Sequence, residues 1–443
     1  MSIRSFSVLL LAATAAAAAS AHAQAGPSPA DRATDPPLAQ RGAPDEGAQA
    51  PLTLDDVLGL AAQSNPMLRG AREGADASAG AFMQAGARPN PQLSLLQEGF
   101  SRAERTSTAL VNQTIELGGK RSARLEVASY GRELALATLD GRAAALRAQV
   151  IAAFYELLAA QRQSQVAQES ADIAARSADL ADKRARAGKV SPVEATKAKV
   201  AATGAQIEAA NAMTQLSAAA EKLVNATGSA VVRERAVIGD LESVPTIEPL
   251  PQLLARIDDA PLSRMAKAAM LRSNAAVSVE RARRMPDITI SAGMKRVITA
   301  GIGDNQAVIG VSIPLPIFDS NKGGLLEAVH KAEQASADFD GEQAGLRLAL
   351  TQAYASYQIA TQEAQRLKAD VLPAARDALN AMSRGYALGK FSFLDVLDAQ
   401  RTLFQEQSRY VQSLADAHAA WAELGRLVGT PLPSGLPQTT DNH

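Results

Sequence analysis

Cysteine is absent from this chain of 443 residues, and aromatic residues make up only 4% of it. Without cysteine there can be no disulfide, no thiolate metal ligand and no lipid attached to an N-terminal cysteine. An excess of charge of one sign is lacking too, because 45 Lys and Arg residues stand against 46 Asp and Glu residues, for a net charge of -1. A nucleic acid partner is therefore not expected.

Long hydrophobic runs are rare, and the clearest one lies at the N-terminus. It extends from Val8 to Ala19, follows Arg4 and precedes a small-residue site at Ala21-His22-Ala23. This pattern predicts a signal peptide over residues 1–23. Residues 24–51 are rich in Ala, Pro, Gly, Asp and Gln without an apolar period, which predicts a disordered leader. No run of about 20 apolar residues follows, so no membrane-spanning helix is expected and the open alternatives are a soluble periplasmic protein or a membrane β-structure.

Proline is missing from a long stretch of helix-forming residues, Ser122 to Arg186. At 1.5 Å per residue this stretch would form a helix about 98 Å long. That length is far too great for an ordinary globular domain.

The second half of the chain repeats the first in outline. Ala187–Glu194 is echoed by Leu388–Asp395, and Gly228 closes a helix as Gly429 closes a later one. Each half is predicted to contain a helix, two short strands, a very long helix, a glycine turn and a returning helix. The first repeat is expected at 52–240, with strands about 91–117 and a helical hairpin about 122–228. The second repeat is expected at 241–432, with strands about 286–315 and a helical hairpin about 323–429. A tail follows at 433–443.

Apolar residues recur every seven positions along the predicted hairpins. The series are Val166, Ile173 and Leu180; Val193, Val200 and Ile207; Val396, Leu403 and Tyr410; and Leu397, Phe404 and Val411. A period of 3.5 predicts coiled-coil packing within each hairpin and against its neighbours. Pro373 is expected to kink or locally unwind its helix, because it lacks a backbone donor.

The strand segments are short and alternate in polarity. Ser101–Ser107 is expected to be a polar loop before a strand at Thr108–Leu117, and Gly301–Asn305 a turn before a strand at Val308–Ile313. About ten residues suffice for a membrane strand, although a small soluble antiparallel sheet would have the same pattern. Four strands leave two unpaired edges, so two copies would form a filled eight-stranded barrel and three copies a hollow twelve-stranded one. A conducting pore therefore favours three copies of a mostly α protein with a small membrane β part.

Three motifs resemble the TolC-type outer-membrane efflux factors, from about Leu52 to Gly429. They are Gly385-Tyr386-Ala387-Leu388-Gly389, Leu394–Gln400, and Gln113–Arg121, the last being most similar to the heavy-metal (cobalt-zinc-cadmium and copper-silver) branch. The resemblance implies a homotrimer in which a trimeric twelve-stranded β-barrel in the outer membrane lipid is continuous with a long α-barrel in the periplasm. It also implies that the helical tips dock with a periplasmic adaptor fed by an inner-membrane resistance-nodulation-division pump. It implies a passive exit duct for heavy-metal cations. Export of drugs or of a secreted polypeptide, and a soluble periplasmic coiled-coil scaffold, remain alternatives.

The resemblance also implies which residues line the pore entrance. Asp395 and Asp398 share a helix face and match carboxylates that line the entrance, although first-turn acids also suit a helix dipole. Tyr386 matches a tyrosine that helps hold the entrance closed. Phe391 stands where some members place an arginine, so gating is expected to rely more on apolar packing.

The two hairpin turns are candidate contacts for the adaptor. They comprise Gly188, Lys189, Val190 and Ser191, and Gly389, Lys390, Phe391 and Ser392. Turn chemistry explains the glycines, and the two serines are predicted N-caps. Exposed apolar side chains at Val190 and Phe391 would be better explained by a partner.

Catalytic, cofactor-binding and metal-binding residues are not predicted. His330 and His418 are isolated on helices without the spacing of metal ligands, and no nucleophile has a matching base nearby in the sequence. Gly118-Gly119 and Gly323-Gly324 lack the context of a phosphate-binding loop, so a steric role at the strand-to-helix junctions is expected.

Overall fold

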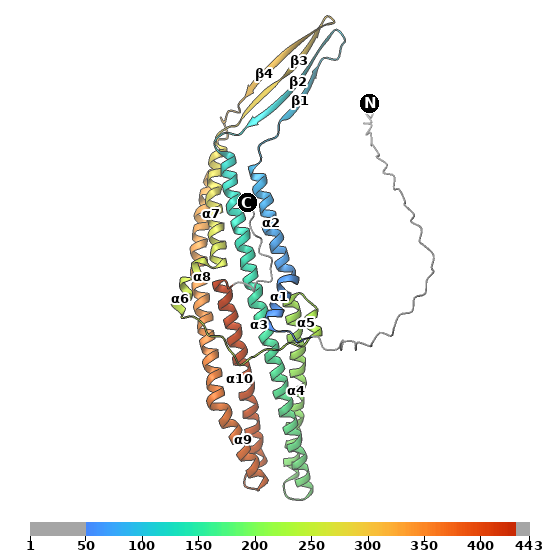
Figure 1. Ribbon diagram of the computed structural model, residues 1–443, viewed down its shortest axis with the longest axis vertical. Helices are drawn as coiled ribbons and strands as arrows, with labels where there is room; N and C mark the ends of the chain where they lie inside the picture. The colour runs from blue at the N-terminus through green and yellow to red at the C-terminus, as the bar shows by residue number, and fades with distance from the viewer. Residues whose placement is uncertain (1–49, 431–443) are drawn as a thin grey trace, which may run out of the picture. The chain divides into compact units, whose positions relative to one another are not determined.

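Two helical hairpins and one four-stranded sheet account for most of residues 50–430, the part of the chain that the computed structural model describes (Figure 1). The predicted signal peptide at 1–23, nearly all of the leader at 24–51 and the tail at 433–443 lie outside the described residues. The first half contains α1 (Leu54–Ser64), α2 (Pro66–Gly86), β1 (Gln92–Glu98), β2 (Glu104–Ile115), α3 (Lys120–Arg186) and α4 (Pro192–Thr227).

A connector with short helices leads to the second half. It contains α5 (Val231–Glu234), α6 (Leu250–Ala255) and the 3-10 turn η1 (Ile257–Asp259). The second half contains α7 (Pro261–Arg283), β3 (Ile288–Thr299), β4 (Ile302–Ser312), α8 (Lys322–Arg366), the π-helical turn η2 (Leu367–Val371), α9 (Leu372–Ala387) and α10 (Phe393–Val428). The predicted order of elements in each half and the continuous long helix, 67 residues in α3, are confirmed.

Local signals explain where the helices begin and end. Asn65 caps α2 by accepting from the backbone N–H groups of Met67 and Leu68, and Pro66 occupies the first turn, where its missing N–H costs nothing. Gly228 and Gly429 end α4 and α10 in the left-handed conformation, with φ of 69° and 79°. Glycine is favoured there because it has no Cβ.

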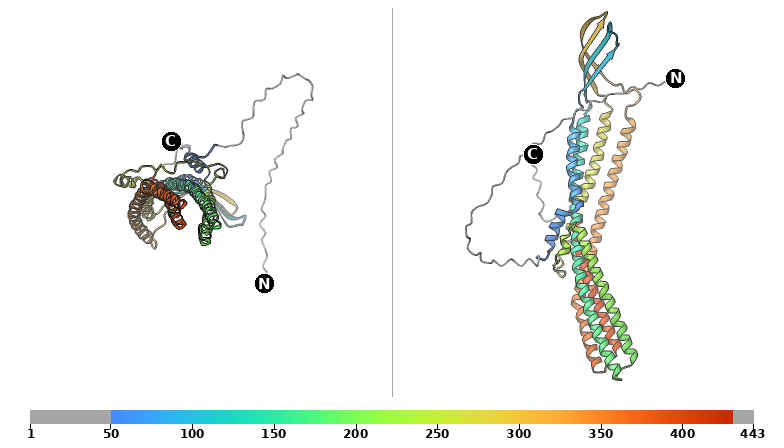
Figure 2. Two further views of the ribbon diagram at one scale, coloured as in Figure 1. Left: turned by 90° about the horizontal axis from the view of Figure 1, so that it is seen from below. Right: turned by 90° about the vertical axis from the view of Figure 1, so that its right-hand side faces the viewer.

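The long helices pack side by side as a curved wall (Figure 2). Toward the hairpin turns the order is α4, α3, α10 and then α8 with α9, whereas toward the sheet it is α2, α3, α7 and α8. Alanine supplies many of the buried positions, which allows the helix axes to approach closely. Helices α3 and α8 belong to both the group near the hairpin turns and the group near the sheet, so they connect the two groups.

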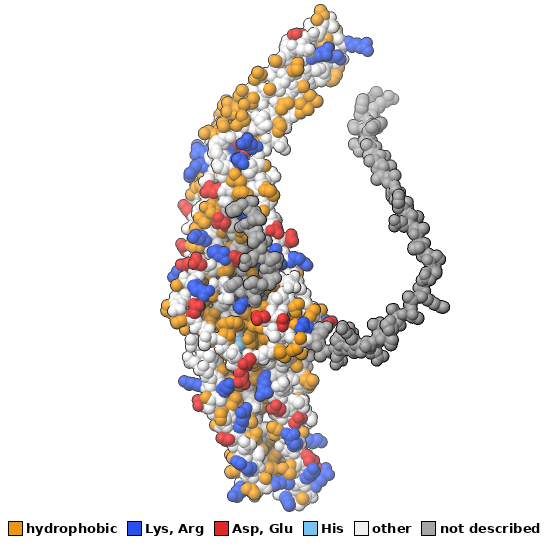
Figure 3. All heavy atoms as spheres, viewed as in Figure 1, with side chains coloured by type: hydrophobic (Ala, Val, Ile, Leu, Met, Phe, Trp, Pro, Cys, Tyr) orange, Lys and Arg blue, Asp and Glu red, His pale blue; other side chains and the backbone are white. Residues whose placement is uncertain are grey.

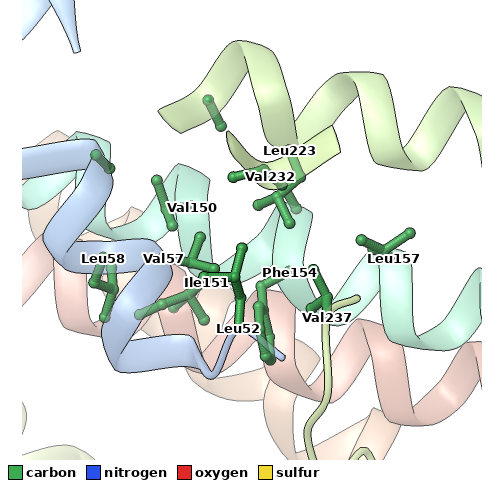
Figure 4. Packing of buried hydrophobic residues seen from close by; sticks show 14 of the residues in the cluster. Leu52, Val57, Leu58, Val150, Ile151, Phe154, Leu157, Leu223, Val232 and Val237 are labelled. Carbon is green, nitrogen blue, oxygen red and sulfur yellow. The ribbon is translucent and has the colours of Figure 1, made fainter. Parts of the chain in front are cut away.

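The largest apolar core lies midway along α3, where the connector crosses the helices. Phe154 and Ile151 of α3 contact Val57 of α1, Leu223 of α4 and Val237 of the connector (Figure 4). A parallel bridge between Leu52 and Val237 holds the start of the described chain against this connector. Ala422 of α10 belongs to the same cluster, so this core also joins the two halves.

The predicted disturbance at Pro373 is confirmed. The π-helical turn η2 precedes Pro373, which occupies the first turn of α9. A proline ring removes one donor and crowds the preceding turn, and the wider π turn relieves that crowding.

The expectation that no helix could cross a membrane requires a correction. By length and composition, α3 contains a window that is apolar enough, with a mean hydropathy of 1.4. However, 61% of that window is buried inside the protein, as in the core helix of a soluble protein. The apolarity of α3 is accounted for by its contacts with neighbouring helices.

The sheet is antiparallel throughout, in the order β1-β2-β3-β4. Two of its predicted boundaries were wrong. Strand β2 begins at Glu104 rather than Thr108, because polar Glu104–Ser107 pair with Arg296–Thr299 of β3. Strand β4 begins at Ile302, because Ala300 and Gly301 alone make the turn, with φ of 51° and 84°.

Candidate functional site

The turns of the two hairpins lie side by side at the end remote from the sheet (Figure 1). Ser191 accepts from the N–H of Val193, and Ser392 accepts from the N–H of Asp395, so both predicted N-caps are confirmed. Gly188 and Gly389 have φ of 69° and 74°, the left-handed conformation that such reversals need.

Tyr386 joins the two hairpins. Its side chain is buried, its hydroxyl donates to Glu194 of α4 at 3.1 Å, and its ring lies 5.6 Å from that of Phe393. Arg184 of α3 donates to the carbonyls of Tyr386 and Ala387, each at 3.0 Å. Its guanidinium also stands over the Tyr386 ring, 4.6 Å from the centroid, where the ring's negative face attracts a cation.

Burial raises the pKa of Tyr386 above its ordinary value of 10.0, with the neighbouring Glu194 acting in the same direction and Arg184 opposing it. The hydroxyl therefore keeps its proton at physiological pH and remains a donor. Sequence reasoning missed Arg184 and Glu194 as its partners. The internal repeat could have indicated Glu194, which is the counterpart of Asp395 in the first half.

Asp395 and Asp398 differ in their contacts. Asp395 forms a capping box with Ser392. The Oδ2 of Asp395 accepts from the backbone N–H of Ser392 at 2.9 Å and from the Ser392 hydroxyl at 2.8 Å. Asp398 pairs with Arg401 at 3.1 Å, and both side chains are about 70% exposed. An exposed pair of this kind contributes at most about 1 kcal/mol, so the charge of Asp398 stays accessible.

Both carboxylates lie along a groove of about 850 Å³ between α3, α4 and α10. Ala201, Ala205 and Glu208 of α4 form one wall, and Phe404 lies on the α10 side. Gln400 is buried there and donates to the carbonyl of Ser170 at 3.1 Å. The structure thus brings the two predicted acids together at the turn end of the wall and adds Glu208 to them.

Apolar exposure at the turns is only partly as expected. Phe391 is 45% exposed, but Val190 is half-buried, so its predicted exposure was wrong. More exposed apolar side chains are Leu388 at 73% and Leu394 at 56%. Phe391 packs its ring over Gly385, where a Cβ would overlap it.

The sheet has one apolar face and one polar face. Cross-strand rows of the face called here the apolar face are Leu93, Val111, Ala292 and Ile309; Leu95, Ala109, Met294 and Ala307; Gln113, Ile290 and Val311; and Ile115 and Ile288. Rows of the polar face include Gln92, Asn112, Ser291 and Gly310, and Thr114, Thr289 and Ser312. Four rows two residues apart span about 20 Å along the strands. Large side chains of the apolar face are open to solvent in the single chain, such as Leu93 at 68% and Ile309 at 83%.

The strand-to-helix junction explains the Gly-Gly-Lys-Arg motif. Gly118 and Gly119 have φ of 70° and 74°, and a Cβ on Gly118 would lie 2.7 Å from the Cβ of Met285. Lys120 binds Asp287 of the second half at 2.6 Å. The motif thus permits a close crossing and ties the two halves together below the sheet.

His418 belongs to the core. It is fully buried, its ring stacks on Tyr155 at 3.5 Å, and its Nε2 contacts the carbonyl of Leu241 in the connector at 3.0 Å. His330 is exposed on α8 beside Glu333. Within residues 50–430, no three His, Asp or Glu side chains gather as metal ligands.

Comparisons with known proteins agree with this architecture. A sequence profile of the family "Outer membrane efflux protein" matches residues 57–229 and again 257–430. This chain belongs to the outer membrane efflux protein family. The family match recurs once in each half, as the internal repeat does, and it is a match to efflux proteins rather than to enzymes.

One curated relative is similar over nearly its whole length. The cobalt-zinc-cadmium resistance protein CzcC of Cupriavidus metallidurans is 44% identical over 383 residues, which are 86% of this chain and 91% of CzcC. Because the family is one of outer membrane proteins, the alternative of a soluble periplasmic scaffold is not retained.

Solved structures share the fold. A membrane protein from Pseudomonas aeruginosa superposes with a TM-score of 0.76 and 20% identity, covering 85% of this chain and 92% of its own. The outer membrane protein VceC from Vibrio cholerae gives a TM-score of 0.72 and 19% identity, covering 86% and 97%. The predicted fold class, mostly helical with long hairpins and a small antiparallel sheet, is confirmed.

Proposed function

We propose that three copies of this chain form the outer membrane exit duct of a tripartite pump for heavy-metal cations. The observation that carries the proposal is the sheet, which has an apolar face, a polar face and two edges, β1 and β4, that no other strand of residues 50–430 pairs with. Lipid cannot satisfy the backbone groups of an open edge, so the strands must pair with other copies. Twelve strands enclose a lumen, which the polar face would line.

The helices support the same assembly. The heptad series on α4 is exposed in the single chain, with Val193 at 62%, Val200 at 69% and Ile207 at 55%. At the other end of the wall, Ile359 of α8 is 66% exposed. The apolar stripe on α4 and the exposed apolar side chain on α8 fit a closed ring of three copies, in which α4 of one copy packs against α8 and α9 of the next.

The turn end is the proposed entrance. Asp395 and Asp398 of three copies would form a ring of six carboxylates, which attracts cations and repels anions. Tyr386, Arg184 and Glu194 would hold the two hairpins together when the entrance is closed. The turns at Gly188–Ser191 and Gly389–Ser392, with exposed Leu388 and Phe391, would contact a periplasmic adaptor connected to an inner-membrane resistance-nodulation-division pump.

Heavy-metal cations are the proposed cargo because the relative that is 44% identical over most of the chain is a cobalt-zinc-cadmium resistance protein. Deletion of the gene should sensitise the host to zinc, cobalt or cadmium while drug tolerance is unchanged. Sensitisation to drugs alone would contradict the cargo and favour the alternative of drug export.

The assembly has a test of its own. Val200→Glu should prevent trimer formation in detergent, because it introduces one charge into each of the three seams between copies. Conductance in planar bilayers should then be lost. Lys199→Glu is the matched control, since Lys199 is exposed on the same helix but off the apolar stripe. A wild-type protein that stays monomeric and does not conduct would overturn the proposal.

A further inference from the structure

The far end of the sheet, away from the helices, separates its charges by face. Glu98 and Asp304 lie in one cross-strand row of the polar face, and Glu104 lies in the next such row, opposite Thr299. Arg105 and Arg296 belong to rows of the apolar face. The carboxylates of this end are therefore all on the side opposite to the two arginines.

The two arginines stand directly beyond the apolar rows. The row after Leu95 and Met294 contains Arg296, and the next contains Arg105, opposite Ile298. Diagonal neighbours of this kind lie about 7–8 Å apart. A Cβ on Gly303 would lie 3.5 Å from the Nε and Nη2 of Arg296, so the guanidinium extends over Gly303 of β4, which belongs to the same cross-strand row as Arg105 of β2.

Neither arginine has an acidic partner among the ion pairs formed within residues 50–430. Both side chains are exposed. Figure 3 shows hydrophobic side chains along the sheet and Lys and Arg side chains near its far end. Guanidinium donors suit the acceptor oxygens of an anion, and both of these guanidiniums face the same side of the sheet.

A groove joins Arg296 to the apolar rows, and Arg105 lies one row beyond this groove on β2. The groove has a volume of about 410 Å³ and is lined by Leu95, Ala109 and Met294 on its apolar side and by Ser107, Arg296 and Asn305 on its polar side. The serine hydroxyl and the asparagine amide add hydrogen-bond donors beside the guanidinium. The groove therefore suits an amphiphile with an acyl chain and an anionic head group.

We propose that Arg105 and Arg296 bind the phosphate of a lipid in the outer leaflet of the membrane, with its acyl chain against Leu95 and Met294. The inference rests on the proposed function, because the apolar face contacts lipid only if the sheet closes into a barrel. Helices in the periplasm then place the far end of the strands at the outer leaflet. Phosphate is favoured over a single carboxylate because two guanidiniums match its charge and its several acceptor oxygens.

Native mass spectrometry of the full-length trimer in detergent tests the proposal by titration with diphosphoryl lipid A. The double variant Arg105→Ala/Arg296→Ala should bind this lipid with a dissociation constant raised about tenfold or more, since charge-assisted hydrogen bonds are lost. Lipid A without phosphates should bind the wild type as weakly as diphosphoryl lipid A binds the double variant.

Lys295→Ala is the matched control, because Lys295 neighbours Arg296 but lies in a row of the polar face. It should leave lipid affinity unchanged. The proposal is overturned if the double variant binds like the wild type, if phosphate removal has no effect, or if Lys295→Ala weakens binding equally.

Two further measurements distinguish a loss of lipid binding from a loss of assembly. Unchanged conductance of the double variant shows that its barrel is intact, and if it does not assemble, the single variants Arg105→Gln and Arg296→Gln replace it. A failure of the proposed function would appear earlier, as a wild-type protein without trimers or conductance.

Discussion

Glu194 and Asp395 occupy equivalent positions in the two repeats, three residues after the serine that begins the returning helix, but their carboxylates do different things. Asp395 closes the capping box of its own helix with Ser392. Glu194 accepts from the hydroxyl of Tyr386, which lies 192 residues along the chain in the other repeat. One repeat therefore uses this position for local stability and the other for a contact between hairpins.

Tyr386→Phe should weaken the contact between the hairpins. Loss of the hydroxyl removes a hydrogen bond to a charged acceptor, for a cost of about 1.5–3 kcal/mol. The entrance should open more often, which single-channel recording would detect as higher conductance or open probability. Tyr354→Phe is the control, because the Tyr354 hydroxyl contacts Gln358 of its own helix. Equal recordings for both variants would count against a gating role.

The paired substitution Asp395→Asn/Asp398→Asn should lower cation selectivity with little loss of stability. Asparagine keeps the acceptor oxygen that the capping box needs but carries no charge. Reversal potentials in a salt gradient measure the selectivity. The corresponding double alanine variant should lose selectivity and also about 1 kcal/mol of stability, because the N–H and hydroxyl of Ser392 lose their acceptor in the capping box. Unchanged reversal potentials in both would argue against a carboxylate ring.

Gly118→Ala should destabilise the protein by about 1–3 kcal/mol, since the residue would carry a Cβ at positive φ and press it against Met285. Gly323→Ala is a matched control in the other half, where a Cβ would meet nothing within 4 Å. It should be neutral or stabilising by up to about 1 kcal/mol, because alanine favours helix. Denaturant unfolding compares the two, and similar losses would contradict the steric explanation.

Stability should fall as the pH drops below about 6.5. Burial lowers the pKa of His418 below its ordinary value of 6.5, against the opposing effects of the Leu241 carbonyl and Asp240. Between the lowered pKa of folded His418 and 6.5, the imidazole is protonated in the unfolded chain but neutral in the folded chain. The free energy of unfolding therefore rises with pH in this range. His418→Gln can still donate to Leu241 but does not titrate. Unfolding measured from pH 7.5 to 5.5 should show a shallower slope in this variant, and an identical slope would exclude His418 as the cause.

Helix limits depend on neighbouring residues and were predictable from the sequence. Strand starts and side-chain contacts that depend on distant residues were not. Ser392 and Gly429 mark the limits of α10 because caps act within one turn. The start of β2 was missed because its first residues are polar, and only pairing with β3 makes them a strand. The contacts of Tyr386 with Arg184 and Glu194 cross between repeats, so no local pattern indicated them. Val190 was expected to be exposed because a turn position does not reveal what packs beside it.

The π-helical turn before Pro373 changes how residue number relates to side-chain direction along this helix. One additional backbone position turns every later side chain by about 100° relative to an unbroken α-helix. A heptad frame counted down from Tyr357 in α8 would therefore assign the wrong orientation to residues beyond Leu372 in α9. Cross-linking or labelling sites must be chosen with a separate count on each side of Leu367–Val371.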